Sequence, residues 1–303
     1  MALVLSGTFL PVTTPFDPVT GDVDVVAFRA NLRIWFESPI RGVLIAGTTG
    51  ESVFLDDEER QLLLEAAADV VPEGALIIAG TGVESTRATI ELSRRAADAG
   101  ADAVLVQPPA YFKGAMTPEA LARHFQAVAD ASPVPVLVYQ VPLRMSTLDL
   151  PTGLVEELSH HQNIVGIKDS RGKLELVGEL VQHSSEGFQV LVGSGALLYA
   201  ALETGAVGGI VAVGLLATAD AAEISVAHSE GRLADAGRIQ ERIAPVHQKI
   251  VAEMGVPGVK AALDLLGLRG GDPRAPLSPA SESRVEAIRD ILESAELLAS
   301  ART

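Results

Sequence analysis

The chain has 303 residues, of which 48% are hydrophobic, and it combines a formal net charge of −16 at pH 7 with no cysteine. Such a charge argues against binding to nucleic acid or to anionic membrane surfaces, because both would repel it. The missing cysteines exclude disulfides, thiolate catalysis and cysteine-based zinc sites, so we expect a soluble protein that acts on small molecules.

The N-terminal stretch MALVLSGTF lacks the length and the basic region of a signal peptide. No run approaches the ~20 apolar residues of a membrane span, so we expect a cytoplasmic protein. The six histidines are scattered, and the one close pair, His160 and His161, would point to different faces of a helix or strand. The sequence therefore predicts no metal site.

Short apolar runs that end in glycine, proline, serine or threonine recur along the first two thirds of the chain and give eight candidate strands. They are GTFLPVTTP from Gly7, GVLIAGTTGES from Gly42, ALIIAGTG from Ala75, DAVLVQPP from Asp102, VPVLVYQVP from Val134, NIVGIKDS from Asn163, FQVLVGSG from Phe188 and GGIVAVG from Gly208. Each run is continuously apolar rather than alternating, which is typical of strands buried on both faces of a parallel sheet.

Amphipathic stretches with helix start and stop signals lie between these runs. Asp56, with Glu59 three residues later, resembles a capping box. Ser85 is suited to cap the helix that follows it, and Thr117 followed by Pro118 is typical of a helix start. The chain therefore predicts strands that alternate with helices.

Eight such units at about 30-residue spacing over residues 1–222 predict an α/β fold of the (β/α)8, or TIM-barrel, type. A doubly wound sheet is the alternative, although the first strand lacks a G-x-G-x-x-G turn. Beyond residue 222 the strand pattern ends, and three helices are predicted at 231–254, 256–268 and 281–299. We predict that residues 223–303 form a helical appendage packed on the barrel.

Ligands of such barrels bind at the carboxyl ends of the strands, which is where VGIKDS places Lys168. One interpretation is an amine that reaches solvent or pairs with Asp169. The other is a buried amine with a lowered pKa, neutral often enough to attack a carbonyl. The residues alone leave both interpretations open.

Other strand ends carry polar groups with two interpretations each. Tyr139 is suited to shuttle protons, or it is a core residue with a polar tip. GTTGES offers backbone amides and the hydroxyls of Thr48 and Thr49 to a carboxylate, or it is an ordinary turn. Arg144 is solvated or binds a carboxylate through both nitrogens. GSGA and GG near the last two strands are suited to a phosphate, although that segment has no lysine or arginine.

In this order and spacing, GTTGES, YQVP followed by Arg144, and GIKDS resemble the dihydrodipicolinate synthase / N-acetylneuraminate lyase family of pyruvate-dependent class I aldolases. The resemblance covers nearly the whole chain. It implies that Lys168 forms a Schiff base with pyruvate or another 2-oxo acid, with no other cofactor, and that the second substrate is an aldehyde. It also implies that Tyr139 relays protons, and that Thr48 and Thr49 hold the pyruvyl carboxylate, Thr49 joining the relay.

The same resemblance implies that Tyr111 reaches the active site across a subunit interface and takes part in catalysis. It implies that Gly193 and Ile210 line the pyruvate pocket, and that Arg144 binds the carboxylate of aspartate semialdehyde, as in the synthases. An interface tyrosine in turn implies a homo-oligomer, for which the family's tetramer of two dimers is the expectation.

The subgroup stays open at this point. Arg144 favours the synthases, whereas Gln140 and the DS of GIKDS depart from them. The stretches GVESTRATIE, FQVLVGSG and GDPRAPL look more like 4-hydroxy-2-oxoglutarate aldolase. The non-enzymatic alternative is a barrel that binds a 2-oxo acid or a phosphate ester without turnover.

Overall fold

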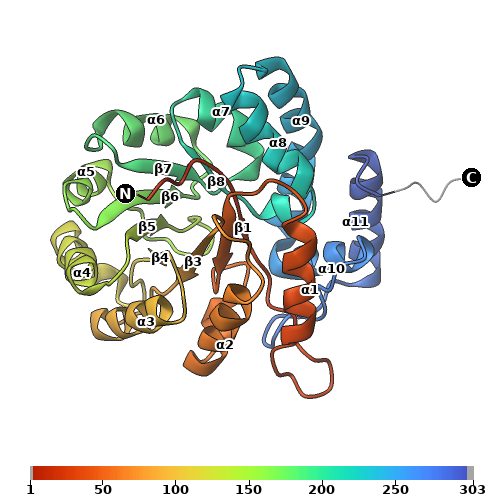
Figure 1. The fold of residues 1–303 in the computed structure, drawn as a ribbon, viewed down its shortest axis with the longest axis horizontal. Helices are drawn as coiled ribbons and strands as arrows, with labels where there is room; N and C mark the ends of the chain where they lie inside the picture. Colours follow the sequence, from red (N-terminus) through yellow and green to blue (C-terminus); the bar gives the residue numbers. More distant parts are fainter. Residues whose placement is uncertain (1–2, 299–303) are drawn as a thin grey trace, which may run out of the picture.

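A closed barrel of eight strands in chain order forms the centre of the computed structural model, which describes residues 3–298 (Figure 1). The strands are β1 (Gly7–Pro11), β2 (Gly42–Ile45), β3 (Leu76–Gly80), β4 (Ala103–Val106), β5 (Val136–Gln140), β6 (Ile164–Asp169), β7 (Gln189–Val192) and β8 (Gly208–Ile210). All pairs are parallel, and β1 pairs with both β2 and β8. The predicted (β/α)8 fold is therefore confirmed, and the doubly wound alternative is wrong because the sheet has no open edge.

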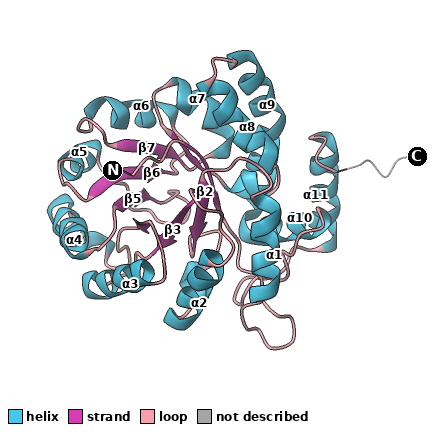
Figure 2. Ribbon diagram, viewed as in Figure 1, coloured by secondary structure: helices cyan, strands magenta, loops and turns pink. Residues whose placement is uncertain are grey.

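One helix follows each strand and covers the outside of the barrel (Figure 2). The helices are α1 (Val25–Trp35), α2 (Asp57–Ala68), α3 (Thr86–Asp98), α4 (Pro118–Ala131), α5 (Thr152–Ser159), α6 (Leu174–His183), α7 (Leu198–Glu203) and α8 (Thr218–Ser229). The predicted starts are confirmed: Asp56 and Glu59 form a capping box, while Ser85 and Thr117 each accept a backbone N–H of the helix that they cap. These caps pair N–H groups that would otherwise lack partners in the first turn.

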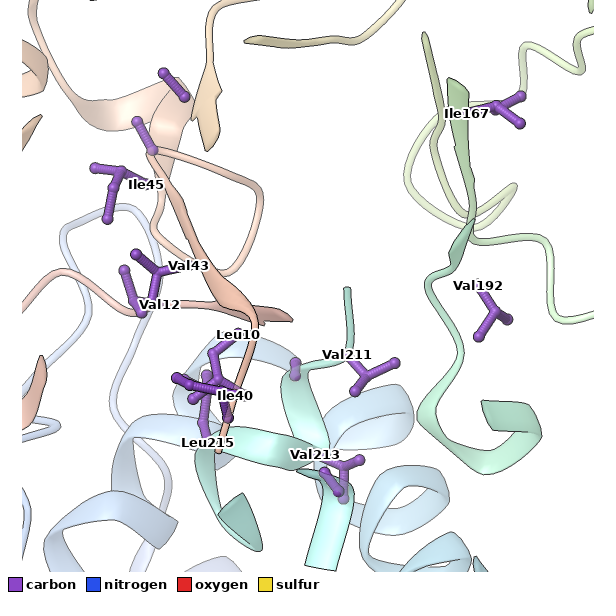
Figure 3. Packing of buried hydrophobic residues seen from close by; sticks show 14 of the residues in the cluster. Leu10, Val12, Ile40, Val43, Ile45, Ile167, Val192, Val211, Val213 and Leu215 are labelled. Carbon is purple, nitrogen blue, oxygen red and sulfur yellow. The ribbon is translucent and has the colours of Figure 1, made fainter. Parts of the chain in front are cut away.

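The strands are buried on both faces, which explains their continuous apolar pattern. One set of side chains packs outward against the helices and includes Ile45 and Ile167, which extend from opposite sides of the barrel (Figure 3). A second set fills the interior and includes Leu137, Tyr139 and Leu191. Because successive side chains of a strand point to opposite faces, the outward position of Ile167 directs Lys168 into the barrel.

The C-terminal helices lie on one side of the barrel, with α11 outermost in Figure 1. Helix α9 (Leu233–Val246) continues into the π-helical segment η5 (His247–Met254), and α10 (Gly255–Leu265) and α11 (Glu282–Ser294) follow. The first predicted helix thus widens into a π-helix just after Pro245, which has no N–H to donate to the α-helical pattern. The predicted end of the last helix, residue 299, lies outside the described residues.

The predicted division of the chain at residue 222 falls within α8 and stays a prediction. Within residues 3–298, no helix is both long and apolar enough to cross a membrane.

A buried ion pair joins this C-terminal extension to the barrel. The Lys260 amine on α10 donates to the Glu51 carboxylate at 2.8 Å and to the backbone carbonyls of Thr14 at 2.9 Å and Asp272 at 2.8 Å. Both charged side chains are 0% exposed, and the Arg274 N–H donates to the other Glu51 oxygen at 2.8 Å. Glu51 of GTTGES is therefore a structural anchor rather than a ligand at the mouth of the barrel.

Candidate active site

A cavity of about 350 Å³ opens at the carboxyl ends of the strands and is closed on one side by η5 and α10. It brings together seven of the eight site residues predicted from the sequence, which are Thr48, Thr49, Tyr139, Arg144, Lys168, Gly193 and Ile210. Among the described residues that line it, there are basic side chains but no aspartate or glutamate. The cavity therefore suits a small anionic molecule.

Lys168 lies inside the barrel near the end of β6, and only 4% of its surface is exposed. Its amine lies 4.5 Å from the centre of the Tyr139 ring, and the two residues are paired in register across β5 and β6. Burial lowers the pKa of Lys168 from its ordinary value, because a charged amine is poorly solvated there, and Tyr139 partly offsets this effect. The solvent-exposed interpretation of Lys168 is thus wrong for this geometry, and no ion pair with Asp169 forms.

The Tyr139 hydroxyl lies 3.3 Å from the Thr48 hydroxyl, so that tyrosine, threonine and lysine form a continuous polar group in an apolar interior. The turn that carries Thr48 and Thr49 is held by left-handed backbone at both ends, with φ of 51° at Ala46 and 58° at Glu51. Such backbone is costly for residues with side chains and is typical of functional sites. Here the buried Glu51 anchor holds one end of that turn.

Gly193 follows β7 where no side chain fits. A Cβ atom at this position would lie 1.8 Å from the Ser170 hydroxyl oxygen, so even alanine would displace the residues that follow Lys168. The glycine therefore lets the end of β7 and the segment after Lys168 lie close together at the cavity wall.

Arg144 stands on the loop between β5 and α5 and faces the cavity from its rim. Gln140 fixes this loop, because its buried amide donates to Val141 O at 2.8 Å and Leu148 O at 3.2 Å and accepts from Leu150 N at 2.7 Å. Gln140 departs from the synthase pattern, but its side chain still holds the loop that follows β5. Arg144 faces the cavity from this loop.

Asp169 has a different partner from the one considered in the sequence. Its carboxylate accepts from the Arg171 Nε at 2.7 Å and from the Arg171 backbone N–H at 2.8 Å. Asp149 accepts from the same guanidinium at 3.1 Å. Arg171 lines the cavity, but its charge is balanced by two carboxylates, whereas Arg144 has no ion pair among the described residues. Arg144 is therefore the free guanidinium of the site.

The sequence analysis missed His247 as a residue of the cavity. It begins η5, and its Nε2 lies 3.3 Å from the hydroxyl of Ser194. Burial, reinforced by the charge of Arg144, lowers the pKa of His247 to about 4. No motif surrounds this histidine, and only its position in an apolar stretch of a predicted helix pointed to a buried ring.

Tyr111 does not reach the cavity of its own chain. It is 81% exposed and packs edge-on against the exposed Phe112, with ring centres 5.2 Å apart. The Glu84 carboxylate fixes its backbone by accepting the N–H groups of Ala110 at 3.0 Å and Tyr111 at 2.9 Å. A role in this chain's own site is excluded by the geometry, whereas a role in a partner's site stays a prediction.

No group of three or more acidic or histidine side chains suited to a metal ion occurs in the part of the chain that the structure describes. The polar groups of the cavity include an amine, a phenol, serine and threonine hydroxyls, an imidazole and two guanidinium groups, one of them paired with carboxylates. A (β/α)8 barrel with a buried, desolvated lysine at a strand end is the arrangement expected in the class of enzymes that attack carbonyl groups through an amine.

Comparison with known proteins identifies the family. The model of the dihydrodipicolinate synthetase family matches residues 4–295, so the chain belongs to this family, whose members are lyases and aldolases. It is 32% identical to a 4-hydroxy-tetrahydrodipicolinate synthase of Syntrophus aciditrophicus (strain SB), over 97% of this chain and all of that relative.

Two further similar proteins bear on whether the chain belongs with the synthases or with the aldolases of the family. A probable mitochondrial 4-hydroxy-2-oxoglutarate aldolase of Emericella nidulans is 34% identical, over 97% of this chain and 96% of the relative. The crystal structure of the dihydrodipicolinate synthase from Acinetobacter baumannii complexed with pyruvate superposes with a TM-score of 0.92 at 29% identity, covering 97% of this chain and 100% of that one.

Proposed function

We propose that the protein is a Schiff-base enzyme that condenses pyruvate with aspartate semialdehyde in the cytoplasm, the reaction of a 4-hydroxy-tetrahydrodipicolinate synthase. The observation that carries the proposal is the buried Lys168 amine beside Tyr139, in a cavity whose rim holds the free guanidinium of Arg144. The names of several relatives, at 32–36% identity, support the same reaction.

In the first half-reaction the neutral Lys168 amine attacks C2 of pyruvate, and loss of water gives an iminium ion. Thr48 and Thr49 hold the pyruvyl carboxylate at the turn after β2. Tyr139, within hydrogen-bond reach of Thr48, takes a proton from C3 and passes it outward, which leaves an enamine. This chemistry needs no metal or dissociable cofactor, because the iminium ion itself accepts the electron pair.

In the second half-reaction the enamine carbon attacks the aldehyde carbon, and the aldehyde oxygen takes up the proton that Tyr139 returns. Arg144 binds the carboxylate of the aldehyde substrate, which an otherwise unpaired guanidinium at the rim is suited to do. The amine that aspartate semialdehyde carries then attacks C2, which closes the ring and expels the Lys168 amine, so that the cyclic product leaves and the free lysine is restored.

The proposal includes a homo-oligomer, expected as a tetramer of two dimers, in which Tyr111 completes the proton relay of a partner. The support for it is the exposed aromatic pair of Tyr111 and Phe112, whose backbone Glu84 holds in place. Large exposed aromatic side chains that lie together are typical of protein–protein contacts.

The second candidate is 4-hydroxy-2-oxoglutarate aldolase, which the relative from Emericella nidulans favours. Both candidates use the same enamine and differ in the aldehyde. Purified protein should therefore be assayed side by side for condensation of pyruvate with aspartate semialdehyde and for cleavage of 4-hydroxy-2-oxoglutarate. We expect a higher kcat/KM for the condensation, and faster cleavage would assign the aldolase function instead.

A third outcome would overturn both enzymatic functions. A protein that binds pyruvate but turns over neither substrate pair, and whose Lys168→Met variant binds pyruvate as tightly, would be a binding barrel without catalysis. Calorimetric titration of both proteins with pyruvate provides this comparison.

A further inference from the structure

Ser194 and His247 form a polar pair on the cavity wall for which the chemistry above has no use. Ser194 follows β7, and His247 begins the π-helical segment that closes the cavity. Their side chains meet at 3.3 Å between the serine Oγ and the histidine Nε2. Segments of π-helix are rare and are frequently found at functional sites, which makes this contact a candidate for substrate binding.

The two nitrogens of the His247 ring have different surroundings. Nδ1 is buried and has no hydrogen-bond partner within the described chain. It packs against Gly195, where a Cβ atom would lie 3.2 Å from Nδ1 and 2.4 Å from a methyl group of Val213. The ring therefore fits tightly on this side and interacts with polar groups only through Nε2.

The different surroundings of the two nitrogens determine which one carries the proton of the neutral ring. A protonated Nδ1 would be a buried donor without an acceptor, which costs more free energy than an unprotonated Nδ1 without a donor. The favoured neutral tautomer therefore carries its proton on Nε2 and donates it to the Ser194 oxygen. Since that oxygen already accepts a hydrogen bond, the serine O–H is free to donate into the cavity.

The charges around the pair indicate what it binds. Arg144, Ser194 and His247 all line this one cavity, and the charge of Arg144 adds to burial in lowering the pKa of His247. No acidic side chain lines the cavity among the described residues, so nothing in the protein competes for these donors there.

We propose that the Ser194 hydroxyl, oriented by His247, binds the carboxylate of the second substrate together with Arg144. The inference rests on the proposed function and deepens it, because it assigns to β7 and η5 a second contact with an aldehyde that carries its own carboxylate. Ser194 is then a substrate-binding residue, and His247 is a positioning residue that acts through it.

The test separates the two substrates of the enzyme. In Ser194→Ala, we expect KM for aspartate semialdehyde to rise about tenfold or more, as for a lost hydrogen bond to a charged group, with kcat little changed. The exchange of pyruvate methyl protons with deuterium, followed by NMR without any aldehyde, should stay at the wild-type rate. Propionaldehyde, which has no carboxylate, should react equally slowly with both proteins.

Variants of the histidine test the positioning role. His247→Phe should raise KM for aspartate semialdehyde as much as Ser194→Ala does, and the double variant should show no further increase. His247→Gln can place an N–H near the position of Nε2 and should restore part of the loss. The matched controls are Ser229→Ala and His183→Gln, two exposed positions that do not line the cavity.

An unchanged KM for aspartate semialdehyde in Ser194→Ala, with proton exchange intact, would overturn the inference alone. An equal loss with propionaldehyde, or slower proton exchange, would also overturn it, because the pair would then serve the reacting centre or the fold. Absence of exchange in the wild-type protein would instead refute the proposed function itself.

Discussion

Replacing Lys260 by methionine removes one half of the ion pair that joins the C-terminal extension to the barrel. The amine makes three hydrogen bonds of 2.8–2.9 Å, and its partner Glu51 is as deeply buried as the amine. Methionine fills similar space, but it leaves the Glu51 carboxylate with the Arg274 N–H as its remaining donor. The predicted loss is therefore that of an uncompensated buried charge rather than that of a cavity.

Breaking a buried pair in this way costs about 3–5 kcal/mol in the free energy of unfolding. An unfolding entropy of about 2.1 cal/mol/K per residue gives a chain of 303 residues about 0.64 kcal/mol/K at the melting temperature. A loss of about 4 kcal/mol then lowers Tm by about 6 °C. Because Glu51 ends the turn of Thr48 and Thr49, KM for pyruvate should rise as well.

Calorimetric unfolding of wild type, Lys260→Met, Glu51→Gln and the double variant measures the coupling directly. The loss of stability in the double variant should be smaller than the sum of the two single losses by about 2 kcal/mol or more, because neither buried charge then remains without its partner. Lys249→Met, an exposed position on η5, is the control and should leave Tm unchanged. A Lys260→Met protein that melts at the same temperature as this control would refute the reasoning.

Three further predictions concern the reaction. Tyr139→Phe should slow the exchange of the pyruvate methyl protons about 100-fold or more, because the proton relay loses its hydroxyl, whereas imine formation should persist. Exchange near the wild-type rate, measured by NMR, would exclude Tyr139 from the relay. Because burial lowers the pKa of Lys168, the rate of imine formation should rise with pH as the ammonium loses its proton and should level off below the ordinary lysine pKa. A stopped-flow rate that still rises at the ordinary lysine pKa would show that the amine is solvated. Tyr111→Phe mixed with inactive Lys168→Met should regain activity if subunits exchange and share sites, and an activity that equals the sum of the separate proteins would place Tyr111 outside the partner's site.

The fold could be predicted from the sequence because each of its signals is local. Continuous apolar runs ending in small residues are what a buried parallel strand requires, and caps such as Asp56 with Glu59 fix the helix starts. The candidate site followed from the same rule, since the carboxyl ends of eight parallel strands converge on one mouth. Lys168 and Tyr139 could thus be placed together without knowledge of their contact.

The rest depends on contacts between distant parts of the chain, which no local pattern shows. In the sequence, Glu51 is a polar residue near a strand end like several others, and nothing local indicates that its partner is Lys260, 209 positions later. Likewise, Asp169 is paired by Arg171, whose position depends on the course of the loop. His247 enters the cavity because a π-helical segment packs over the barrel, and helical periodicity alone does not predict that packing.

The most direct test of the account is reductive trapping. Borohydride added with saturating pyruvate should leave a stable reduced adduct on Lys168, identified by peptide mass, and Lys168→Met should show none. Lys260 is an internal control, because it is just as buried but is paired with Glu51 and does not line the cavity. An unmodified Lys168, or an adduct on another lysine, would contradict the central claim that burial in the barrel makes this amine the nucleophile.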